Sequence, residues 1–347
     1  MGIMEGQGSA VGSSDLVPVS IGNDDVRAAC LHAIEQDRLP GTLLIAGPEH
    51  VGKTHLVREL IPHLVDVASW HGPLEEHPDV WWDDSEETFP IGRVKELRGK
   101  GEPSLREFLS LAPYGKQHRI AVIGQAQRMT VDASNALLKI LEEPPERTHI
   151  VLTVPNEEMV PSTVKSRAMV MHAVPVPTGD IAAWLVKEHS IDEKLALQYA
   201  RHAEGRPGRA LRYVENPGLL AAENEWATLL FDHAGVGLFG GLKLAGSIVQ
   251  QSASARDRAR EALRVWESLL SDVALLQTGR DERCVWAEHA GELSSWAAAI
   301  PAASVVRHLS AVREGRSTLE QYAQPKLVMD VVIFSLFASD HPLPAVR

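Results

Sequence analysis

The sequence predicts an α/β module with a parallel five-stranded sheet, followed by an all-helical second half. Two observations predict the module: short apolar runs rich in β-strand formers recur through the first half, and helical patterns separate them. Strands that alternate with helices are typical of a parallel sheet covered on both faces. A third observation predicts the helical half. From Thr178 onward only amphipathic helical spacing remains.

The expected strands are short and mostly apolar. They lie at Thr42 to Ala46, Asp79 to Trp82, Ile120 to Ile123, His149 to Val154 and Met169 to Val174. The helix after the third strand is the best defined, because Thr130 can cap its first turn and Pro144-Pro145 stops it. Apolar residues recur along one face of this helix at Ala133, Ala136, Leu137, Ile140 and Leu141.

The bulk composition is that of a folded, acidic protein. A length of 347 residues with 44% hydrophobic residues predicts two or three domains. Lys and Arg total 34 against 46 Asp and Glu, and this net charge of -12 argues against a strong autonomous DNA binder. The two cysteines, Cys30 and Cys284, form no CxxC pair, which predicts buried free thiols in a reducing compartment. With no signal pattern and no membrane-spanning run, we expect a cytoplasmic location and no membrane partner.

Composition breaks suggest how the chain is divided. Residues 1–14 are rich in Gly and Ser and are expected to form a disordered tail. Residues 15–175 are expected to form the α/β domain and residues 176–218 a small helical domain. Residues 219–347 are expected to form a larger helical domain, whose start is marked by the break Asn216-Pro217-Gly218.

A phosphate-binding loop is complete between the first strand and the next helix. Residues 47–54 read GPEHVGKT, which fits the pattern GxxxxGK[ST]. Glycines let successive backbone N–H groups point at phosphate oxygens, while Lys53 reaches the β and γ phosphates and Thr54 offers its hydroxyl to Mg²⁺. An ordinary glycine turn is the alternative. The expected ligand is ATP or ADP, whether or not Mg²⁺ accompanies it, and the binding residues are Gly47, Val51, Gly52, Lys53 and Thr54.

The acids that normally complete such a site are missing. Hydrolysing P-loop proteins carry a metal-holding Asp at the end of a neighbouring strand, and many carry a Glu beside it, but here Gly124 and Gln125 follow the third strand. We interpret Asp83, Asp84 and Asp132 as solvated surface carboxylates and assign no metal-ligating residue. Loss of the general base alone lowers a rate by roughly 10² to 10⁴, so hydrolysis by this chain should be negligible.

Residues 129–145, MTVDASNALLKILEEPP, closely resemble the signature helix of bacterial clamp-loader AAA+ subunits. Other stretches of that family occur in the family's order at Arg38-Leu39-Pro40, His77-Pro78-Asp79, Leu109 to Tyr114 and Pro161 to Arg167. The resemblance covers roughly residues 20 to 215 and is more specific than any single motif. It implies a P-loop AAA+ module, a small helical lid and an all-helical collar domain that forms a ring.

The resemblance also implies a role. In clamp loaders the Ser-Arg motif, here Ser166-Arg167, carries an arginine finger that acts on a neighbouring subunit's nucleotide. Gly208 stands where motor subunits carry a nucleotide-sensing arginine. Together with the missing acids, this indicates the subunit type that does not hydrolyse nucleotide and helps to load the sliding clamp. The implied partners are the gamma/tau motor subunits, the delta subunit, the sliding clamp and primed DNA, in a hetero-oligomer of the DNA polymerase III holoenzyme.

The chain also departs from the family's pattern elsewhere, as where Ser166-Arg167-Ala168 replaces the usual Ser-Arg-Cys. Many relatives hold zinc with four cysteines, but residues 61–76 contain none here, so we expect no structural zinc. An apparent insertion at residues 99–104 is interpreted as a flexible surface loop.

Several alternatives stay open. The chain could be a catalytically active AAA+ ATPase that uses an unrecognised acid, or a stand-alone P-loop transferase. Arg167 could be an ordinary surface or salt-bridging arginine. The apolar stripes of the collar could serve either an internal core or a subunit contact. These stripes include Trp266, Leu269, Leu270 and Val273, then Leu327, Val328, Val331, Val332, Phe334 and Leu336.

Overall fold

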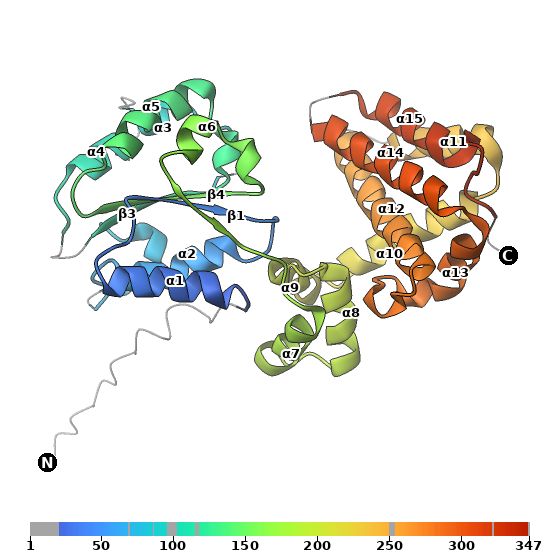
Figure 1. The fold of residues 1–347 in the computed structure, drawn as a ribbon, viewed down its shortest axis with the longest axis horizontal. Helices are drawn as coiled ribbons and strands as arrows, with labels where there is room; N and C mark the ends of the chain where they lie inside the picture. The colour runs from blue at the N-terminus through green and yellow to red at the C-terminus, as the bar shows by residue number, and fades with distance from the viewer. Residues whose placement is uncertain are drawn as a thin grey trace, which may run out of the picture. The chain divides into compact units, whose positions relative to one another are not determined.

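The computed structural model describes residues 21–68, 70–85, 87–95, 103–114, 118–249, 254–320 and 323–345. The expected tail at residues 1–14 and residues 99–102 of the expected surface loop lie outside these ranges. The chain divides into two compact units (Figure 1). The first unit is Met1–Trp184 with Gly205–Arg209, and the second is Leu185–Glu204 with Ala210–Arg347.

The first unit contains a five-stranded parallel sheet, as the sequence predicts. Its strands are β1 (Thr42–Ala46), β2 (Val80–Asp83), β3 (Arg119–Ile123), β4 (Thr148–Val154) and β5 (Met169–His172), in the order β2-β3-β4-β1-β5. The fifth strand ends earlier than expected. The Val174 N–H donates to the side-chain oxygen of Asn23 (2.7 Å) and does not continue the ladder.

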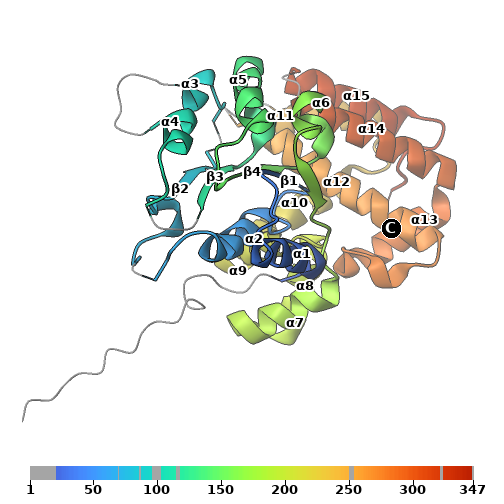
Figure 2. The same ribbon diagram turned by 60° about the vertical axis from the view of Figure 1, so that its left-hand side comes forward.

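Helices cover both faces of this sheet (Figures 1 and 2). They are α1 (Asp24–Glu35), α2 (Lys53–Leu60), α3 (Ile91–Val94), α4 (Leu105–Ser110), α5 (Val131–Glu142) and α6 (Ser162–Lys165). Leu43 and Ile45 of β1 pack with the buried residues of α1 and α2, whereas Leu44 and Ala46 pack with those of α3 to α6. Successive side chains of a strand point to opposite faces, so each buried strand contributes to both cores. The cap predicted for α5 is confirmed, because the Thr130 hydroxyl accepts from the Ala133 N–H (3.1 Å).

The motifs His77-Pro78-Asp79 and Leu109 to Tyr114 meet near the start of β2 and β3. Both carboxylate oxygens of Asp79 accept from the Tyr114 N–H (2.8 and 3.0 Å), and Oδ1 lies 3.2 Å from Nε of Arg119. Arg119 also donates to the Phe108 carbonyl (2.7 Å), and both charged side chains are buried. A buried ion pair is stable only when hydrogen bonds satisfy its remaining polar groups. These residues form a buried polar network at the strand ends opposite the phosphate-binding loop.

From Thr178 onward every regular element in the described ranges is a helix, in agreement with the sequence. The α-helices are α7 (Thr178–His189), α8 (Glu193–Ala203), α9 (Pro207–Glu215), α10 (Gly218–His233), α11 (Gly237–Val249), α12 (Ala255–Gln277), α13 (Ala290–Ala299), α14 (Ala302–Glu320) and α15 (Pro325–Ala338). Residues 176–218, the expected lid, are shared between the two compact units. The division of the chain at residues 175 and 218 stays a prediction.

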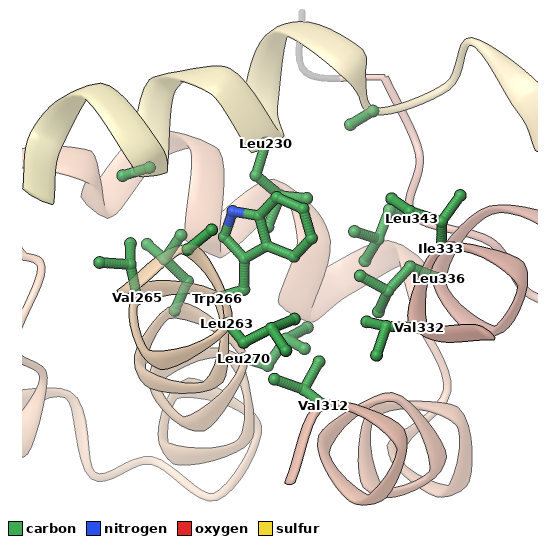
Figure 3. Close-up of a cluster of buried hydrophobic side chains, with 14 of the residues drawn as sticks. Leu230, Leu263, Val265, Trp266, Leu270, Val312, Val332, Ile333, Leu336 and Leu343 are labelled. Carbon is green, nitrogen blue, oxygen red and sulfur yellow. The ribbon is translucent and has the colours of Figure 1, made fainter. Parts of the chain in front are cut away.

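The second unit is built around Trp266 of α12 (Figure 3). This side chain is fully buried, and its indole N–H donates to the Trp226 carbonyl (3.1 Å). The apolar residues of α15 lie on two faces of the helix, one buried and one exposed. Val328, Val332 and Leu336 are buried in the core, whereas Leu327, Val331 and Phe334 are 60–69% exposed. Core packing therefore explains only the first of these two sets.

Candidate functional site

The phosphate-binding loop joins β1 to α2, as the sequence predicts. Gly52 has a φ of 105° and lies directly before the helix, a conformation that favours glycine. At Gly47 a Cβ atom would lie only 2.3 Å from the Ala173 carbonyl oxygen, so that position also requires glycine. Val51 packs its side chain into the core below the loop. Both glycine positions are thus explained by the backbone path.

Lys53 spans the loop. Its Nζ donates to the carbonyl oxygens of Gly47 (2.6 Å) and Pro48 (2.8 Å). Burial lowers the pKa of Lys53 to about 8, although the charges of Glu49 and Asp84 oppose this shift. An ammonium group held by carbonyls at a helix N-terminus can exchange them for phosphate oxygens. The space above Gly52 is open, with nothing within 4 Å of a Cβ there, and Thr54 lies half-buried in the first turn of α2. The residues present therefore fit a bound phosphate.

The structure at the ends of β2 and β3 differs from the prediction for Asp83 and Asp84. Asp83 and Asp84 are not solvated surface carboxylates, since Asp83 is buried and Asp84 is half-buried. Strand β2 pairs directly with β3, so the residues after β2 lie beside Gly124. Asp83 accepts from the Ser85 hydroxyl (2.8 Å) and lies 3.4 Å from Arg93. Asp132 is exposed, as expected.

Gln125 follows Gly124 with a φ of 50°. Its N–H donates to the Thr153 hydroxyl at 3.3 Å, which ties the end of β3 to β4. The side chain at this position is an amide, which can orient a water molecule but cannot take its proton. The structure therefore places no general base at the residue where the hydrolysing proteins carry one.

Arg167 lies on the surface between α6 and β5. Its guanidinium forms an ion pair with Glu142 at the end of α5 and donates to the Thr163 carbonyl (2.8 Å). Met169 pairs with Leu43 near the start of β1, whereas the loop follows the other end of that strand. Three residues of strand separate these levels by about 10 Å. The structure thus does not bring Arg167 to the loop of its own chain.

A backbone hydrogen bond that the sequence did not predict also joins Gly208 to the phosphate-binding loop. The Gly208 N–H donates to the His50 carbonyl (2.9 Å), and a Cβ at Gly208 would lie 3.1 Å from the same oxygen. A larger side chain at this position would crowd the loop. Sequence reasoning singled out Gly208 only for the absence of an arginine, because a backbone N–H has no signature in the sequence.

Two further findings concern the described residues alone. None of their helices has the length and apolar character needed to cross a membrane. No group of three or more His, Cys, Asp or Glu residues lies together as a metal cluster in the ranges that the structure covers. Cys30 and Cys284 are both buried free thiols, as predicted, and burial raises the pKa of each to about 11.

Comparisons with known proteins agree with these motifs. Residues 23–176 match the family model described as DNA polymerase III, delta subunit. The Escherichia coli DNA polymerase III subunit delta' is 29% identical over 150 residues, covering 42% of each chain. The Escherichia coli subunit tau is 26% identical over 204 residues, which cover 56% of this chain and 32% of tau. The chain therefore spans less than half the length of either curated relative.

A solved DNA polymerase III gamma subunit-related protein from Thermotoga maritima is 18% identical, with a TM-score of 0.40. That match covers 89% of this chain and 98% of the other. The segment matched by the family model contains the phosphate-binding loop, helix α5 and Arg167. Residues 23–176 of this chain are thus similar to clamp-loader AAA+ subunits.

Proposed function

We propose that the chain is a clamp-loader subunit of the delta-prime type, which binds nucleotide without hydrolysing it. One observation carries the proposal: the loop at residues 47–54 is complete, yet Gly124 and Gln125 follow β3. The loop supplies phosphate-binding groups, whereas Gln125 cannot act as a general base. A subunit that has the phosphate-binding loop but lacks the general base can hold a nucleotide without cleaving it. ATP hydrolysis in the assembly then takes place in other subunits, on the nucleotides that they bind.

Arg167 is proposed to act in trans on a neighbouring motor subunit. Its position about 10 Å along the strands from its own loop argues against action within one chain. The side chain is on the surface, and its partners Glu142 and Thr163 belong to the same exposed corner. An ion pair at the surface contributes little to stability, so the guanidinium can leave Glu142 when a γ-phosphate is presented.

The assembly is proposed to contain gamma/tau motor subunits and a delta subunit, and to act on the sliding clamp and primed DNA. The exposed residues Leu327, Val331 and Phe334 of α15 support a subunit contact in the helical half, because three large apolar side chains share one helix face. DNA would be contacted through the complex, since this chain carries a net charge of -12.

The direct test is ATP turnover by the purified chain. We expect none above the level of the Lys53→Ala variant, because no general base follows β3. Nucleotide binding, measured with a fluorescent ADP, should nevertheless be lost in Lys53→Ala.

The second candidate function is an active ATPase, and the acid Asp84 beside Gly124 favours it. Turnover by the chain alone that disappears in Lys53→Ala would establish this alternative and overturn the proposal.

Nucleotide affinity is expected to fall as the pH rises above about 8. Burial lowers the pKa of Lys53 to about 8, so the amine is charged below this pH and neutral above it. Phosphate binding needs the charged form, and each further pH unit should then lower affinity by up to about tenfold. Titration of fluorescent ADP between pH 6.5 and 9.5 measures the effect. The Lys53→Met variant should bind weakly with no step near pH 8, and an identical step in that variant would assign it to another group.

A further inference from the structure

An acid from another strand fills the space that the missing acid of β3 would occupy. Strands β2 and β3 pair in parallel with Asp83 opposite Ile123, and the Gly124 N–H donates to the Asp83 carbonyl (2.7 Å). Asp84 and Gly124 are therefore neighbours just beyond the ladder. A Cβ atom built on Gly124 would lie 2.0 Å from Oδ1 of Asp84. The Asp84 carboxylate thus occupies the position where a side chain of residue 124 would begin.

Because of this contact, an acid at position 124 and Asp84 in its present position cannot both be present. A Cβ atom cannot approach an oxygen to 2.0 Å, so an aspartate at position 124 would displace Asp84. The glycine, which removes the usual acid, is also what admits the carboxylate from β2. The loss of the acid at 124 and the position of Asp84 are thus parts of one arrangement.

The charge of Asp84 also interacts with the charge of Lys53 in the phosphate-binding loop. The Asp84 charge raises the pKa of Lys53, and the charge of Lys53 in turn lowers that of Asp84. Burial outweighs this effect and raises the pKa of Asp84 above its ordinary value. Asp83 adds to the rise, whereas Arg58 and Arg128 oppose it. In the described part of the chain the Asp84 carboxylate makes no hydrogen bond or ion pair of its own, so its oxygens remain available.

We propose that Asp84 positions the Mg²⁺ of a nucleotide bound at Lys53 and Thr54, in place of the acid that Gly124 lacks. The inference rests on the proposed nucleotide binding. Mg²⁺ keeps several waters and is usually held by one or two carboxylates together with phosphate oxygens. One half-buried carboxylate is therefore enough, and a cluster of three ligands is not required. Because Gln125 still supplies no base, such a site holds Mg²⁺-nucleotide without cleaving it.

The test compares the affinity for fluorescent ADP with Mg²⁺ and with EDTA. We expect Mg²⁺ to strengthen binding to the wild-type chain. In Asp84→Asn the affinity in EDTA should be retained, while the affinity of the ADP complex for the metal falls by about 10- to 100-fold. Electron paramagnetic resonance of Mn²⁺ in the ADP complex gives the metal affinity directly, without any hydrolysis. Asp132→Asn is the matched control, because Asp132 is an exposed aspartate, and it should behave as wild type.

A second variant approaches the same site from the other strand. Gly124→Ala adds the Cβ that meets Asp84, so it should weaken metal binding as Asp84→Asn does, and thermal unfolding verifies that both variants are folded. If ADP binds to wild type and Asp84→Asn keeps the full effect of Mg²⁺, the inference is wrong and the proposed nucleotide binding survives. If wild type binds no ADP in either buffer, the nucleotide-binding part of the proposed function fails, and this inference fails with it.

Discussion

Replacing Arg167 by alanine is expected to slow ATP hydrolysis in the neighbouring motor subunit by about 10³-fold or more. An arginine finger stabilises charge that develops on the transferred phosphoryl group, and its removal leaves that charge uncompensated. Arg167 is suited to this role because it is exposed and lies away from its own loop. Single-turnover hydrolysis by the assembled loader should lose the phase that belongs to the site next to this chain. The isolated chain should be unchanged, since it has no turnover to lose.

Two variants make the Arg167 experiment specific. Lys165→Ala removes a positive charge two residues away that pairs with Glu157 and Glu158, and it should leave the hydrolysis phase intact. Arg167→Lys keeps the charge but loses the planar, bidentate fork, so it should recover little of the rate. Assembly of each variant is verified by size-exclusion chromatography. An Arg167→Ala loader that assembles and hydrolyses at the wild-type rate would leave Arg167 as an ordinary surface arginine paired with Glu142.

Replacing Asp79 by alanine is expected to lower the free energy of unfolding of the α/β module by about 3–5 kcal/mol. The change leaves the buried guanidinium of Arg119 without its carboxylate and the Tyr114 N–H without an acceptor. An unpaired buried charge costs far more than a lost surface contact. Hydrogen exchange should show lost protection in peptides of β2 and β3, with little change in peptides of α12 and α14.

The exposed Asp66 provides the control for Asp79. Among the residues that the structure describes, its carboxylate accepts only from the Ala68 N–H (3.1 Å). Asp66→Ala should therefore lower the free energy of unfolding much less than Asp79→Ala does. The double variant Asp79→Leu with Arg119→Met removes both charges and should recover part of the stability. Unchanged protection of β2 and β3 in Asp79→Ala would show that the buried pair is not what stabilises this corner of the module.

Local chemistry made much of the fold predictable. Strands β1, β3 and β4 appear as apolar runs because both of their faces are buried. The start of α5 is marked by Thr130, whose hydroxyl satisfies a backbone N–H of the first turn. The phosphate-binding loop was predictable for the same reason, since its glycines and Lys53 act within eight consecutive residues. The helical second half followed from spacing alone.

The apolar pattern of α15 shows where such reasoning ends. Nearly the whole helix is apolar, so periodicity does not separate the face that packs on the core from the face that does not. Only packing against α11 and α14 assigns Val332 to the core and leaves Phe334 exposed.

An α/β module followed in the chain by helices, a loop that fits phosphate and the absence of an acid after β3 could all be predicted from the residues. Which distant residues meet depends on how the strands pair. Asp84 reaches the space beside Gly124 because β2 pairs with β3, and Arg167 lies away from the loop because β5 runs parallel to β1. Hydrophobic periodicity records which face of a strand is buried, but it carries no information about which strand is its neighbour.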